Sequence, residues 1–201
     1  MTRSVVASDM TVGEISNTGI SNLMHSAARD GLNGTLSFLS QIGTGIDVAD
    51  DTGRTPLHFA AENGHGVAVQ WLFNEGAEIE AKDRYGRTPL HCAAAKGHEA
   101  AVQQLLNRGA RVETRDNTSR TPLHLAAHEG HDTVVQWLLK GGADREAKNN
   151  DGWTPLWFAA MQRHETIMQR LLHERVDIER KDDAGWTPLH WAANNGRTAV
   201  V

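Results

Sequence analysis

Cysteine is almost absent from this chain, because Cys92 is the only one in 201 residues. An internal disulfide framework and a cysteine-based zinc site are therefore excluded, and the composition fits a reducing compartment. No apolar run of about 18 residues occurs, and the amino terminus, MTRSVVASDMTVGEISNTG, lacks the apolar core of a signal peptide. We therefore expect an intracellular protein with no membrane insertion, in the cytoplasm first and in the nucleus as the alternative.

An excess of positive charge is also lacking, since the formal net charge is −5. Nothing attracts the whole chain to nucleic acid, and the arginines at 54, 84, 87 and 120 are interrupted by Asp and Glu. Nucleic acid is therefore not expected as a partner.

A 33-residue period runs through the sequence. Thr-Pro-Leu-His begins at Thr55, Thr88, Thr121 and Thr187, and Thr-Pro-Leu-Trp begins at Thr154. Asn22-Leu23-Met24-His25 is a degenerate copy one period earlier. A glycine follows each start by nine residues, at Gly31, Gly64, Gly97, Gly130 and Gly196, with Arg163 as the exception. A fixed period of this length indicates stacked repeats.

One unit can be interpreted from its residues. Thr55 is suited to cap a helix, and Pro56 to occupy its first position, where a missing amide costs nothing. Gly64 is expected to end that helix in a left-handed conformation. A second apolar helix follows and closes at Gly76, before the extended stretch AEIEAKDRYGR. Each unit is therefore predicted to be two short antiparallel helices and a projecting turn.

These residues resemble the ankyrin repeat: Thr-Pro-Leu-His-x-Ala-Ala, then Gly-His, Leu-Leu and Gly-Ala, recur in register from about Gly19 to Val201. The resemblance implies an all-α solenoid of stacked antiparallel helix pairs with projecting β-turn or hairpin loops. We expect a flexible amino-terminal segment, 1–18, and an ankyrin repeat domain, 19–201. Its repeats are 19–51, 52–84, 85–117, 118–150, 151–183 and the incomplete 184–201.

The two ends of the array differ. The first copy is interpreted as an amino-terminal cap, with Asn22 at the capping position and a polar outer face. The sixth copy stops at Val201, a few residues into its second helix. We therefore interpret the sequence as a fragment of a longer array or as a truncated gene product.

The resemblance assigns nine of the eleven histidines to the scaffold. Hydrogen bonds to the backbone between neighbouring repeats are implied for His25, His58, His91, His124 and His190, and the start of the second helix for His65, His98, His131 and His164. In the fifth copy, Trp157 stands at the position that His124 and His190 hold in the neighbouring copies. Its indole donates but does not accept, so the histidine's bonds are in doubt there.

Catalytic and metal chemistry find little support. His124, His128 and His131 suggest a metal site, but two of them have scaffold positions and the spacing is not that of a zinc motif. Cys92 follows His91, yet its slot holds Phe59, Leu125 or Phe158 in other copies, which indicates a packing role. No phosphate-binding loop, nucleophile elbow or dinucleotide motif occurs. We expect no catalytic residue, metal or cofactor, and no enzyme.

Two rows of charge also repeat. Acidic residues recur at Glu80, Glu113, Glu146 and Glu179, and basic residues at Lys82, Arg115, Lys148 and Lys181. We interpret them as a solvated, mutually compensating ladder.

The partner-contact positions that the resemblance implies flank the turn glycine and the end of the first helix. The residues predicted to bind a partner are Arg54, Arg84, Tyr85, Arg87, Arg120, His128, Trp153, Met161 and Trp186. Our hypothesis is a graded groove, cationic in the middle repeats and aromatic toward the carboxyl end, for a segment with acidic and apolar residues. The alternative is that these Arg are an ordinary family choice and the Trp only cover their neighbours.

The leading functional prediction is a non-enzymatic, monomeric adaptor that binds a protein segment in its concave groove. One alternative is a regulatory segment of a larger enzyme or signalling protein whose effector domain lies outside this chain. Another is a structural spacer without a selective partner.

Overall fold

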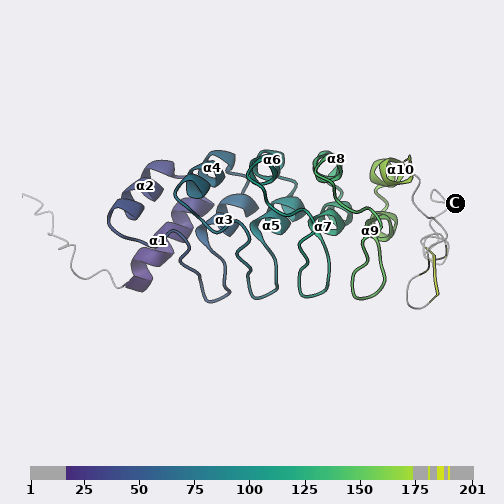
Figure 1. Cartoon of the computed structure of the whole chain (residues 1–201), viewed down its shortest axis with the longest axis horizontal. Helices are drawn as coiled ribbons and strands as arrows, with labels where there is room; N and C mark the ends of the chain where they lie inside the picture. The colour runs from purple at the N-terminus through teal and green to yellow at the C-terminus, as the bar shows by residue number, and fades with distance from the viewer. Residues whose placement is uncertain (1–16, 174–180, 182–184, 188–189, 191–201) are drawn as a thin grey trace, which may run out of the picture.

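The computed structural model describes residues 17–173, 181, 185–187 and 190, and its helices lie in two rows (Figure 1). The first helices of the pairs are α1 (Asn17–Arg29), α3 (Pro56–Glu62), α5 (Pro89–Lys96), α7 (Pro122–Glu129) and α9 (Pro155–Gln162). The second helices are α2 (Asn33–Gln41), α4 (Gly66–Asn74), α6 (Glu99–Asn107), α8 (Asp132–Lys140) and α10 (Glu165–His173). Each helix contacts its pair partner and the equivalent helix of the neighbouring pair. The predicted all-α solenoid is confirmed.

Threonine and histidine together start the first helices. The Thr55 side chain accepts from the His58 backbone amide, and Nδ1 of His58 accepts from the Thr55 amide at 3.1 Å. Pro56 occupies the first helical position, where no intrahelical donor is needed. The same reciprocal cap starts α5 and α7. The predicted threonine caps are confirmed, with the histidine as an additional member.

Small and large apolar residues divide the packing between them. The first helices of the pairs are called the inner helices below. Their paired alanines, such as Ala93 and Ala94, are fully buried and let neighbouring helices approach closely. Leu90, Leu105 and Leu123 are among the largest buried side chains. They belong to one apolar core that runs from α1 to α10. Each pair is therefore stabilised by its neighbours.

Histidines link successive repeats through the backbone. Nε2 donates to the carbonyl just before the next threonine in three cases, His58 to Arg87 (3.0 Å), His91 to Arg120 (3.1 Å) and His124 to Trp153 (3.1 Å). Nδ1 accepts from the cap, which leaves the proton on Nε2. Burial lowers the pKa of these rings, to about 4 for His91 and His124, so they stay neutral.

His25 is an exception. Its Nε2 bonds to the carbonyl of Val48 at 2.7 Å, inside its own repeat. The prediction of an inter-repeat bond is wrong there.

The second set of histidines points back to the preceding repeat. Nε2 of His65 bonds to the Arg29 carbonyl at 2.8 Å, and Nε2 of His164 bonds to the His128 carbonyl at 3.0 Å. Each of these rings lies against the glycine that ends the first helix of the preceding repeat. A Cβ at Gly97 (φ +74°) would lie 2.5 Å from Nδ1 of His131. The glycine therefore provides both a left-handed turn and space for a ring.

Arg163 takes this glycine position in the fifth repeat, with φ +66°. The residue one period after His164 is Arg197 rather than histidine. The helix-ending glycine and the histidine of the next repeat are therefore both replaced here, by Arg163 and Arg197. Arg197 lies outside the described residues.

We expect Arg163→Gly to stabilise the protein by about 0.5–1 kcal/mol. A non-glycine residue in the left-handed conformation costs the folded protein about 1–2 kcal/mol, which the change to glycine removes. Part of that gain is lost because glycine gives the unfolded chain more conformational entropy. Urea denaturation followed by circular dichroism measures the change, with Gln162→Gly, inside α9, as the destabilising control. An Arg163→Gly protein that is less stable than the original would contradict the assignment of strain.

Side chains of both charged rows bond to the backbone of the following repeat. Glu80 accepts from the Arg111 amide at 2.7 Å, and Glu113 accepts from the Asp144 amide at 2.8 Å. Nζ of Lys82 donates to the carbonyl of Arg115. These side chains therefore also tie each repeat to the backbone of the next, which the interpretation as a solvated, mutually compensating ladder did not include.

The first repeat differs from its predicted form. α1 begins at Asn17, so Asn22 lies inside the helix and two residues of the expected segment 1–18 are helical. Four large apolar side chains are exposed, Leu23 (48%), Leu32 (50%), Phe38 (60%) and Ile42 (50%). The surface of the first repeat therefore combines these apolar side chains with exposed polar ones such as Ser26 and Thr35. Residues 1–16 and 191–201 lie outside the described residues, as do the predictions made for them.

Candidate partner-binding surface

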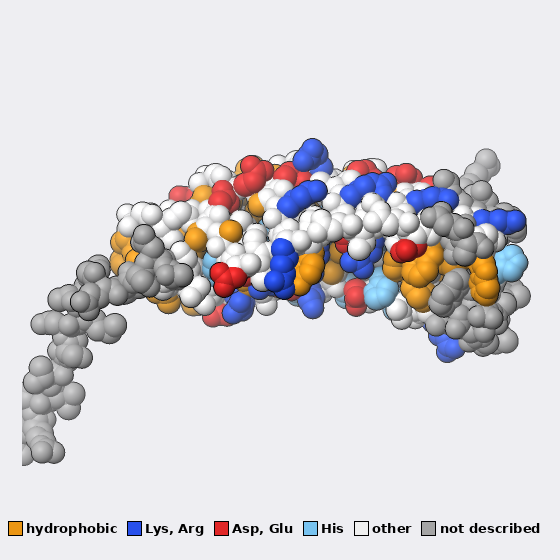
Figure 2. Space-filling model, turned by 90° about the horizontal axis from the view of Figure 1, so that it is seen from below, with side chains coloured by type: hydrophobic (Ala, Val, Ile, Leu, Met, Phe, Trp, Pro, Cys, Tyr) orange, Lys and Arg blue, Asp and Glu red, His pale blue; other side chains and the backbone are white. Residues whose placement is uncertain are grey.

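The nine predicted contact residues come from the projecting loops and the inner helices. Backbone hydrogen bonds join neighbouring loops, from the Arg84 amide to Thr52 O (2.8 Å) and from the Asn117 amide to Tyr85 O (2.9 Å). Figure 2 views the array from the side of the loop tips. Charged side chains are prominent near its middle, and apolar side chains gather toward the carboxyl-terminal end. The loops therefore present one continuous surface.

The arginines that precede the threonines are paired with the aspartate four residues earlier in the same loop. Arg87 contacts Asp83 at 2.8 Å, and Arg120 contacts Asp116 at 3.0 Å. Arg54 contacts Asp50 at 3.4 Å and Glu62 at 3.1 Å, and its guanidinium lies over the Phe59 ring. The expected cationic half of the groove is therefore largely neutralised.

These aspartates also organise the loop turns. Asp83 Oδ1 accepts from the amides of Tyr85 and Arg87, each at 2.9 Å. Burial raises the pKa of Asp50, but hydrogen bonds from the Thr52 side chain and from two backbone amides, with the charge of Arg54, bring it down to about 2. Asp50 therefore stays ionised, and each of these aspartates holds both a turn and an arginine.

Arg84 and Tyr85 form the charged contact at the loop tip. Arg84 is exposed and has no ion pair among the described residues, and its Nη2 donates to the Tyr85 hydroxyl at 2.7 Å. The Tyr85 ring is 49% exposed. The guanidinium carbons of Arg84 and Arg87 lie 4.8 and 4.9 Å from its centroid. This tip offers an aromatic ring and a positive charge together.

An aromatic stack replaces the ion pair in the fifth repeat. Trp153 and Trp157 are parallel within 2°, with centroids 5.9 Å apart, and Phe158 meets Trp153 edge-on at 5.7 Å. Trp157 is only 3% exposed, so Trp153 carries the accessible side of the stack. Trp186 occupies the same position in the next repeat and is 38% exposed. The predicted aromatic residues are present, with Trp157 buried beneath them.

Asn149 is a residue that the sequence interpretation missed. It stands where other repeats have Asp50, Asp83 and Asp116, and its Oδ1 accepts from the amides of Asp151 and Trp153. In the fifth repeat asparagine and tryptophan replace aspartate and arginine, whereas Trp186 of the sixth copy keeps an aspartate, Asp182, at the equivalent position. That paired change is visible in the sequence and marks the fifth repeat as the apolar one.

His128 and Met161 lie where the inner helices end. Nδ1 of His128 contacts Glu129 at 2.9 Å, its Nε2 contacts Gln162 Nε2 at 3.0 Å, and its ring meets Phe158 edge-on. Met161 is half-buried against the core. His128 therefore packs beside the aromatic cluster through Phe158, and Met161 packs against the core.

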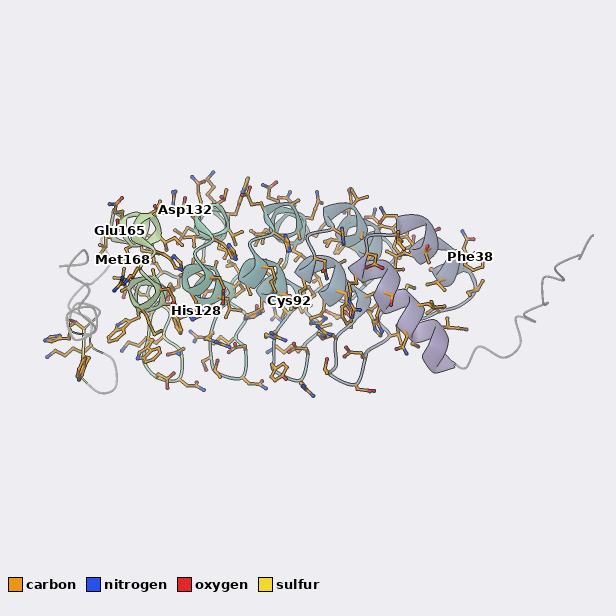
Figure 3. All side chains as sticks on the ribbon, turned by 180° about the vertical axis from the view of Figure 1, so that it is seen from behind. Phe38, Cys92, His128, Asp132, Glu165 and Met168 are labelled. Carbon is orange, nitrogen blue, oxygen red and sulfur yellow. The ribbon has the colours of Figure 1, made fainter. Side chains whose placement is uncertain are left out.

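The histidine and the cysteine considered for metal binding or catalysis both have structural roles. Both ring nitrogens of His124 are used within the scaffold, and the described residues hold no group of three or more His, Cys, Asp or Glu able to bind a metal. Cys92, on α5 in Figure 3, is buried, and this burial raises the pKa of its thiol to about 12. Its thiolate, the reactive form, is therefore strongly disfavoured.

No helix in the described part of the chain is long and apolar enough to span a membrane.

Comparison with known proteins agrees with the repeat geometry. A family model for ankyrin repeats, in three copies, matches residues 23–116, 69–149, 106–182 and 123–201. None of the curated proteins compared with the chain matches it.

Proposed function

Because this chain belongs to the ankyrin-repeat family, whose repeats are generally protein–protein interaction modules, we propose that it is an adaptor that binds a protein segment along its loop side. The observation that carries the proposal is the line of accessible groups from Tyr85 and Arg84 to Trp153 and Trp186. Tryptophan, tyrosine and arginine are the side chains that most often dominate interface energies.

The chemistry of the surface describes the segment it fits. Arg54, Arg87 and Arg120 already have carboxylate partners, so Arg84 is the cation that would attract an acidic side chain. Trp153 and Trp186 would contact an apolar one. The segment is therefore more apolar and less acidic than a fully cationic groove would select.

Rigidity favours this function. The loops are bonded to each other and the inner helices are packed in a single core. Little conformational freedom is therefore lost by the adaptor when a segment binds. We propose a location inside the cell, in the cytoplasm or the nucleus, where a free thiol such as Cys92 stays reduced.

The test compares the chain with two variants in quantitative affinity capture from native lysate. The groove variant is Arg84→Ala, Tyr85→Ser, Trp186→Ser, and the control is Val67→Ser, an exposed apolar position on α4. We expect specific proteins to be retained by the original chain and the control, and to fall at least about tenfold with the groove variant. Circular dichroism checks that all are folded. Equal retention by all three proteins would contradict the proposal.

A further inference from the structure

The loops and inner helices carry a charge that changes from one unit of the array to the next. A unit here means an inner helix with the loop that precedes it. In the α5 unit, Arg84 at the loop tip and Lys96 at the end of the helix are both cations, and both are exposed. Neither has an ion pair in the part of the chain that the structure describes. The α5 unit therefore presents two uncompensated positive charges.

The units on either side of α5 have the opposite sign. In the α3 unit, Asp51 is exposed, and Arg54 is shared between the carboxylates of Asp50 and Glu62. In the α7 unit, the loop tip is uncharged, and the side chain of Glu129 is 50% exposed. Glu129 pairs with no lysine or arginine among the described residues. An acidic group on a partner therefore has one favourable place, at α5, with repulsion on both sides.

The α9 unit is the apolar one. Its loop carries Trp153, which stacks on Trp157 and meets Phe158 edge-on. The helix-end position holds the uncharged Gln162, and the exposed charge of the loop is the carboxylate of Asp151. This unit therefore suits an apolar side chain and disfavours an acidic one. Positive, negative and apolar units follow one another at α5, α7 and α9.

The spacing of these units matches the rise of an extended segment. The helices α5, α7 and α9 lie side by side (Figure 1), and helices packed in this way are about 8–10 Å apart. A polyproline-type segment rises about 3.1 Å per residue with three residues per turn. Every third side chain therefore lies on one face, at intervals of about 9 Å. Three such side chains reach the three units in succession.

We propose that the protein binds an extended segment in which an acidic, a basic and an apolar residue stand three apart and face α5, α7 and α9 in that order. The inference rests on the proposed adaptor function and narrows its partner from a composition to an order and a spacing. Complementary charges fix the register of an interface, and like charges brought together exclude wrong partners. The segment therefore cannot slide by one unit without placing its acidic residue against Glu129 or Asp51.

Fluorescence anisotropy with synthetic peptides tests the order of the charges. The probe is a labelled peptide with Asp, Lys and Phe at every third position, separated by Pro-Ser pairs. Its control has Asp and Lys exchanged, and each peptide is also made in the reverse chain direction. We expect the tighter control to have a Kd at least about tenfold above that of the tighter probe, because it brings like charges together. Equal Kd values, or no binding of the probe up to ~1 mM, would overturn the proposal.

A charge exchange tests where the acidic residue binds. Arg84→Glu with Lys96→Glu should raise the Kd of the probe at least about tenfold, and a peptide with Lys in place of Asp should recover most of this loss. The matched control is Arg108→Glu with Lys140→Glu, which makes the same change of net charge beside α6 and α8 and should change the Kd less than about twofold. Circular dichroism checks that both variants are folded. Failure of the exchanged peptide to recover binding would reject the register.

Failure of this inference can be distinguished from failure of the adaptor function. Capture from lysate that depends on the groove variant supports the adaptor, whatever peptide order is preferred. If capture shows that dependence while the probe and its control bind equally, the adaptor function holds and the proposed segment is wrong. If capture is the same for all the proteins compared, the adaptor function itself is contradicted.

Discussion

Lowering the pH from 7 to 4 will destabilise the protein by about 6 kcal/mol through His91 and His124 alone. Burial lowers the pKa of both to about 4, from 6.5. Below pH 6.5 the unfolded chain therefore binds protons that the folded chain does not. The stabilisation is complete above pH 6.5 and is lost as the pH falls toward 4, about 3 kcal/mol for each ring. Burial lowers the pKa of His58 in the same direction.

Urea denaturation at a series of pH values measures this loss. The control is His91→Gln with His124→Gln, which cannot titrate and should flatten the profile between pH 6.5 and 4 while lowering stability at pH 7. The pKa of Asp50 is lowered to about 2, so its contribution is lost only below the usual 3.8, in a separate window. A profile as steep in the double variant as in the original chain would contradict the assignment to these histidines.

Gly97→Ala will cost about 2 kcal/mol. Alanine must adopt the left-handed conformation, at about 1–2 kcal/mol, and its Cβ would displace the His131 ring, whose bond to the Ala95 carbonyl is worth about 1 kcal/mol. The smaller entropy of the unfolded variant offsets part of this loss.

The matched control is Arg163→Ala, at the same position of a repeat that already lacks glycine. Its stability should change by less than about 0.5 kcal/mol. Gly97→Ala combined with His131→Ala should be less destabilising than the sum of the single changes, because the steric conflict can be lost only once. Chemical denaturation of the four proteins gives these differences. Strict additivity would show that the glycine provides a turn but no space for the ring.

Local chemistry made the helix pairs predictable. A threonine, a proline and a histidine within four residues specify a capped helix start, and a glycine nine residues after the threonine specifies its end. The departures at Trp157 and Arg163 were visible in the same way. The stacking of Trp153 on Trp157 was not, because Trp153 precedes the cap residue Thr154 and so lies in the loop rather than on a face of α9.

The candidate surface was predictable only in part. The contact positions follow from the register, but the neutralisation of Arg87 depends on a turn that directs Asp83 back toward it. Similarly, the sequence suggests that the charges of Glu80 and Lys82 compensate each other. In the stacked repeats, each side chain forms a hydrogen bond to a backbone group of the next repeat. Spacing along the chain gives no information on such competition.

The sequence by itself determined the repeat and its helix pairs, because capping, glycine conformation and a 33-residue period are local properties that recur. Only the tertiary structure decided which charges remain available, that Trp157 is buried beneath Trp153, and that Leu32 and Phe38 lie exposed at the end of the array. These features depend on which neighbour occupies each face, and the repeat pattern does not specify that neighbour for its first member.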